Sequence, residues 1–69
     1  MRYAVLFEQT DTGFSAHVPD LPGCIAAGAT LPETTDLIRI AIRMHVAGMA
    51  EDGEPIPEAK TIAEYIVAA

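Results

Sequence analysis

The sequence predicts an α+β fold in which a small antiparallel three-stranded sheet packs on one helix and a C-terminal strand follows, in the order β-β-β-α-β. Three observations predict it: two β-like runs around a polar turn, a proline-bracketed turn before a third apolar run, and a long segment with a helix-start signature. No repeat or linker divides the 69 residues, so we expect a single domain over residues 1–69.

Two runs of β-forming residues predict an N-terminal hairpin. Residues 2–8 place Tyr3 and two further apolar side chains at alternate positions, as a strand requires. Residues 9–13 read Gln-Thr-Asp-Thr-Gly, which are residues that bond their own backbone or accept unusual φ values. Residues 14–18 then form the second β-like run, so the two strands should pair antiparallel.

A rigid turn separates the hairpin from a third strand. Residues 19–23 read Pro-Asp-Leu-Pro-Gly, where two prolines remove backbone donors and fix φ. Residues 24–28 are short, apolar and bounded by glycines, which favours a strand that returns beside the second one.

A helix is expected from about residue 31 to Glu51. Thr30 is a suitable N-cap, Glu33 completes a capping box and Pro32 occupies the first turn, where a missing N–H costs little. Asp52-Gly53 should end it. After a proline-containing loop, the β-formers within residues 62–67 favour a last strand.

The helix carries more apolar residues than one sheet can cover. One set has the spacing of a sheet-facing stripe: Leu37, Ile38, Ala41, Met44, Ala47 and Gly48. A second set widens the apolar arc and predicts a dimer or partner interface: Ile40, Ile42, Val46 and Met49. In the proline turn, Asp20 and Leu21 are further candidates for partner contact, since loops on rigid scaffolds often bind. For Asp20, an Asx-turn bond is the structural alternative.

Charge and cysteine content restrict the function. Ten carboxylates against four Lys and Arg give a net charge of −6, which disfavours contact with nucleic acid phosphates and favours a basic protein partner. The single cysteine, Cys24, cannot form an internal disulfide and is expected to be a small buried hydrophobe. No apolar run approaches the length of a membrane span, so we expect a cytoplasmic protein.

No catalytic, cofactor or metal site is expected. A two-metal nuclease needs converging carboxylates. The acidic residues here are scattered, and Glu33 and Asp36 are explained by helix capping and the helix dipole. His17 and His45 lack other ligands at metal-binding spacing.

Several motifs together resemble the HicB-like antitoxin family over nearly the whole chain. They are Tyr3, Pro19-Asp20-Leu21-Pro22-Gly23-Cys24 after the second strand, Gly28-x-Thr30 before the helix, and Gly53-Glu54-x-Ile56-Pro57 after it. Ala29 departs from the acidic residue usual at its position, and Pro32-Glu33-Thr34-Thr35 replaces a more acidic, alanine-containing helix start.

The resemblance implies a truncated ribonuclease-H-like fold without nuclease activity, homodimerisation or higher self-association, and a role as antitoxin to a small mRNA-cleaving toxin of the HicA type. Many family members carry a C-terminal DNA-binding segment, which these residues do not encode, so promoter binding by them is not expected. Two alternatives remain: a solitary interaction module that has lost its toxin, and a divergent nuclease.

Overall fold

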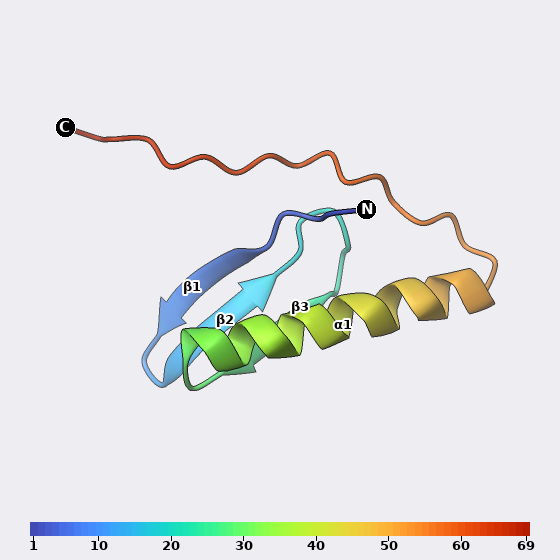
Figure 1. The fold of residues 1–69 in the computed structure, drawn as a ribbon, viewed down its shortest axis with the longest axis horizontal. Coiled ribbons are helices and arrows are strands. Elements are labelled where there is room, and N and C mark those ends of the chain that lie inside the picture. Colours follow the sequence, from blue (N-terminus) through green and yellow to red (C-terminus); the bar gives the residue numbers. More distant parts are fainter.

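The computed structural model describes all 69 residues and has two layers. Strands β1 (Leu6–Thr10), β2 (Gly13–His17) and β3 (Ile25–Gly28) form a sheet in that order, with both neighbouring pairs antiparallel. Helix α1 (Leu31–Glu51) lies across one face of the sheet, as Figure 1 shows. The predicted sheet of three strands on one helix is therefore confirmed.

The hairpin forms as predicted, but β1 begins later than the sequence pattern indicates. Residues 2–5 precede the strand, and Tyr3 and Val5 pack against the core from that position. Within the sheet, Phe7 is opposite Ala16, and Ala16 is opposite Ala26, so these three side chains share the face that α1 covers. All five residues of β1 are exposed, because α1 packs on β2 and β3.

The proline turn is part of the core and not only a connection. Three backbone bonds close it: Val18 N–H to the Cys24 carbonyl (3.1 Å), Leu21 N–H to the Val18 carbonyl and Cys24 N–H to the Leu21 carbonyl (both 3.0 Å). The fold encloses the Leu21 side chain completely, at 0% exposure, together with Ala16, Val18, Cys24 and Ile38. The expectation that Leu21 contacts a partner is corrected, since the chain's own core covers it.

The predicted caps of α1 are present. The Thr30 hydroxyl accepts the Glu33 N–H at 3.2 Å, and the Glu33 carboxylate accepts the Ala29 N–H at 3.1 Å, one residue earlier than in a standard capping box. At the other end, Glu54 N–H bonds to the Met49 carbonyl at 2.9 Å while Gly53 adopts φ +70°. This is a Schellman arrangement, in which glycine accepts the left-handed conformation readily.

The rotation of α1 differs from the predicted one. Thr34 and Ile38 are buried, and Ala41, Ile42 and Val46 continue the same face against the core. Thr34 can be buried because its hydroxyl donates to the Thr30 carbonyl at 2.8 Å. A pattern based on apolar residues alone misses this position, and so it wrongly placed Leu37 and Met44 on the sheet, whereas both are exposed.

The predicted last strand does not form within this chain. Residues 54–69 have no helix or strand assigned, and Figure 1 shows them as an extended segment beyond the β1 side of the sheet. Residues 62–69 make no hydrogen bond to the rest of the chain. An isolated extended segment has no neighbouring strand to pair with its backbone N–H and C=O groups. A sequence rich in β-forming residues is therefore not enough to produce a strand.

Candidate partner interface

The Asp20 carboxylate connects the proline turn to the C-terminal segment. One oxygen accepts the backbone N–H groups of Lys60 (3.0 Å) and Thr61 (2.9 Å), and the other accepts the Thr61 hydroxyl at 2.6 Å. These bonds, that of the Thr61 hydroxyl above all, lower the pKa of Asp20 below its ordinary value. The structure thus gives Asp20 a role inside the chain that neither the partner-contact nor the Asx-turn interpretation anticipated.

A second attachment holds the same segment from the N-terminal side. The Tyr3 hydroxyl donates to the Pro57 carbonyl at 2.7 Å. Both attachments join residues at least 40 positions apart in the sequence, so no local pattern could identify them. Together they fix the position from which residues 62–69 leave the body of the molecule.

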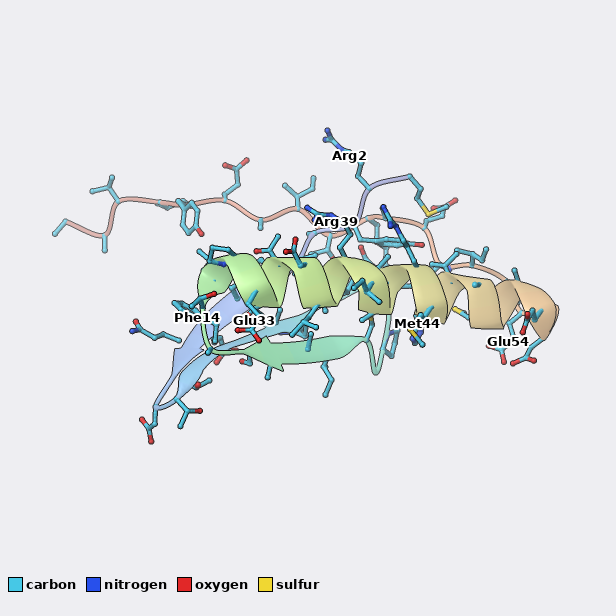
Figure 2. All side chains as sticks on the ribbon, turned by 60° about the horizontal axis from the view of Figure 1, so that its bottom comes forward. Arg2, Phe14, Glu33, Arg39, Met44 and Glu54 are labelled. Atoms are coloured by element: carbon cyan, nitrogen blue, oxygen red, sulfur yellow. The ribbon has the colours of Figure 1, made fainter.

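An exposed apolar stripe runs along the outer side of α1. It consists of Leu37, Ile40 and Met44, which are 39%, 52% and 69% exposed. In Figure 2 the Met44 side chain projects from α1 on the opposite side from Arg39. A shallow cavity of about 350 Å³ lies between Met44 and the start of β3, beside Gly23, Ile25 and His45. We call Leu37, Ile40 and Met44 the α1 stripe.

Two other predicted interface residues lie on a different side of the helix. Ile42 and Val46 are half-buried and, with Met1 and Tyr3, line an apolar groove of about 400 Å³. Met49 is also half-buried. Apart from Met49, the predicted residues are distributed over the proline turn, the core, the α1 stripe and this groove, so the six do not form one patch.

The polar chemistry of the surface is sparse. Arg39 and Asp36 form an exposed ion pair at 3.1 Å, a type that contributes little to stability. No three His, Cys, Asp or Glu side chains come together as metal ligands would.

Cys24 is buried, as predicted, and its burial raises the pKa of the thiol. The structure contains no helix that combines the length and the apolar character that a membrane crossing requires.

Comparison with known proteins finds two sequence relatives that align with most of this chain. The chain is 41% identical over 66 residues to an uncharacterised 14.9 kDa protein from the rep-hol intergenic region of Haemophilus phage HP1 (strain HP1c1); the match covers 96% of this chain but only 50% of that relative. It is 33% identical over 57 residues to a UPF0150 protein of Synechocystis sp., covering 81% and 72% of the two chains. The chain thus spans about half the length of the phage protein.

A solved structure also matches. The fold superimposes on a chain of a HicA3 and HicB3 toxin-antitoxin complex with a TM-score of 0.74 and 27% identity, covering 87% of this chain and 70% of the other. Residues 3–69 match the family described as the HicB_like antitoxin of bacterial toxin-antitoxin system. This family match, over nearly all of the sequence, shows that the chain belongs to the HicB-like antitoxin family.

Proposed function

We propose that this chain is the antitoxin of a type II toxin-antitoxin system, which binds and inhibits a small mRNA-cleaving toxin of the HicA type in the cytoplasm. The observation that carries the proposal is its likeness to a chain of the HicA3 and HicB3 complex over 87% of its length, together with its family membership. The net charge of −6 supports a basic protein partner in preference to RNA or DNA.

The α1 stripe is the surface that we propose for the toxin. Its three side chains are apolar, adjacent on one helix and accessible, whereas Leu21 is enclosed. Met44, with its flexible thioether, can adapt to a partner's surface. Asp36 beside the stripe is paired with Arg39, so the attraction of a basic protein comes from the net charge of −6 of the whole chain.

Co-expression with the product of the adjacent small reading frame tests this proposal. The tagged antitoxin should retain the toxin through purification at a fixed stoichiometry. Ile40→Asp and Met44→Asp should reduce the toxin that is retained, because each buries an unpaired carboxylate in the complex. Ala47→Asp is the matched control, since Ala47 is exposed on the same helix but lines the groove beside Met1.

Two results would change the assignment. If Ala47→Asp releases the toxin and Ile40→Asp does not, the toxin binds the groove and not the α1 stripe. If the parent chain retains no toxin, the proposal fails and the solitary interaction module replaces it. Nuclease function has less support, because the Asp20 and Glu33 carboxylates are engaged in bonds to the chain's own backbone.

A further inference from the structure

Two successive cavities separate residues 2–7, which lead into β1, from the C-terminal segment. The first cavity, about 510 Å³, lies between residues 2–4 on one side and Ala59, Thr61 and Ile62 on the other. The second cavity, about 360 Å³, lies between residues 5–7 and residues 63–65. Residue numbers rise in the same direction along both walls, so the two segments run parallel to each other with the slot between them. We call these two cavities together the β1 slot.

Both walls of the β1 slot offer unpaired backbone groups. β1 is an edge strand, and alternate residues of an edge strand direct their N–H and C=O groups away from the sheet. On the opposite wall, residues 62–69 make no hydrogen bond. Each wall therefore has the hydrogen-bonding capacity to accept a strand placed between them.

The C-terminal segment is also unusually apolar for an exposed stretch of chain. Ile62, Tyr65, Ile66 and Val67 are 83%, 106%, 86% and 86% exposed. Glu64 is the only charged residue among residues 62–69, so the repulsion that a net charge of −6 causes elsewhere is weak at this segment. Exposed apolar side chains on an extended, unpaired segment are characteristic of an association surface.

The start of this segment is held against the outer wall. Asp20 fixes Lys60 and Thr61, and Tyr3 fixes Pro57. With these bonds in place, the segment continues along the far side of the slot instead of pairing with β1 of its own chain. A strand that filled the slot would then have to come from another molecule.

We propose that residues 62–67 of a second copy of this chain fill the β1 slot, and that the two copies exchange these segments. Under a two-fold axis, the second copy's segment runs opposite to the first, and so it is antiparallel to both walls of the slot. The strand order across the dimer is β3, β2, β1, partner's segment, own segment, partner's β1, partner's β2, partner's β3. One continuous sheet results, in which every segment has neighbours on both sides except β3.

The occupant is a second copy because this chain supplies the complement of its own slot. The slot has the shape for an extended apolar segment, and residues 62–67 are such a segment, anchored beside it. A two-fold axis fills both slots at once, since the segment of each copy occupies the slot of the other copy. The strand that the sequence predicts for residues 62–67 thus forms between copies and not within one.

Size-exclusion chromatography with light scattering on the purified chain, without toxin, tests the exchange. The parent should have the mass of two chains and not that of one 7.3 kDa chain. Ile66→Lys should be monomeric yet folded by circular dichroism, because Ile66 is 86% exposed in the single chain. Met44→Lys, a matched exposed position on α1, should remain dimeric. In hydrogen exchange, amides of residues 62–67 should be protected in the parent and unprotected in Ile66→Lys.

A monomeric parent at high micromolar concentration would overturn the proposal. So would an Ile66→Lys variant that stays dimeric, or a dimeric parent in which the amides of residues 62–67 exchange freely. Loss of the dimer in Met44→Lys alone would assign the dimer face to α1 instead. No toxin is present in this assay, so its outcome is independent of the antitoxin proposal.

Discussion

Asp20 holds Thr61 by two hydrogen bonds, accepting its N–H at 2.9 Å and its hydroxyl at 2.6 Å across 41 positions of sequence. The next residue, Leu21, is fully enclosed in the core, so the turn that presents the carboxylate is itself fixed. The core thereby determines where the C-terminal segment leaves the body. The packing of Leu21, the position of the Asp20 carboxylate and the course of residues 62–69 therefore depend on one another.

The acid dependence of this contact follows from the lowered pKa of Asp20. The folded chain keeps the carboxylate ionised to a lower pH than the unfolded chain does, because the Thr61 hydroxyl and N–H bonds favour the charged form. The contact therefore contributes fully above the ordinary value of 3.8 and is lost as pH falls through the lowered pKa. Carbon-detected NMR titration of the Asp20 carboxyl should give a midpoint below 3.8 in the parent and a higher one in Thr61→Val. Equal midpoints in the two proteins would contradict this account.

Leu21→Ala should destabilise the fold strongly. Removing a fully enclosed leucine costs about 2–5 kcal/mol, which is a large part of the roughly 3–10 kcal/mol expected for a chain of this size. Ile25→Ala is the control, since Ile25 is 70% exposed, and its effect should stay within about 0.5 kcal/mol. Urea unfolding at equal protein concentration measures both. Similar midpoints for the two variants would show that Leu21 is not a core residue.

Two glycine substitutions should have opposite effects. A Cβ at Gly28 would lie 2.7 Å from the Thr34 hydroxyl oxygen and 3.1 Å from the Thr34 nitrogen, and Thr34 is fully buried. Gly28→Ala should therefore cost about 1–3 kcal/mol. At Gly48, within α1, a Cβ meets no neighbouring atom, so Gly48→Ala should stabilise by about 0.5–1 kcal/mol. Thermal unfolding of the parent and the two variants measures both effects. A Gly28→Ala variant that is as stable as the parent would refute the close packing of β3 on the helix start.

Cys24 should react slowly with alkylating reagents in the folded protein. Its thiol is buried and burial raises its pKa, so both access and the thiolate fraction are reduced near neutral pH. Mass spectrometry should show little modification by iodoacetamide until denaturant is added, and then complete modification. Rapid labelling of the native chain would indicate that the proline turn opens readily.

Local signals predicted the elements whose partners are close in sequence. The Thr30 cap, the Gly53 stop and the hairpin turn each involve contacts within a few residues, and all three are present. The rotation of α1 was not predictable in this way, because buried Thr34 looks polar in the sequence and becomes suitable for the core only through its bond to the Thr30 carbonyl.

The candidate site was predictable only in part. The sequence indicates Ile40 as an exposed apolar residue, which agrees with its 52% exposure, but it does not indicate that Leu21 belongs to the core or that Ile42 and Val46 line a separate groove. The contacts of Asp20 with Thr61 and of Tyr3 with Pro57 depend on the completed fold. Residues 62–67 were assigned to a strand from composition, but a strand also needs a neighbour, which the sequence does not identify.

The most direct measurement of the antitoxin function is titration of the toxin's ribonuclease activity with the purified chain. Toxin from the adjacent reading frame would be assayed on mRNA with increasing amounts of antitoxin, and Met44→Asp would serve as the weakened comparison. Inhibition should be complete at a fixed molar ratio for the parent and should require more protein for the variant. Full cleavage in the presence of excess parent chain would contradict the account.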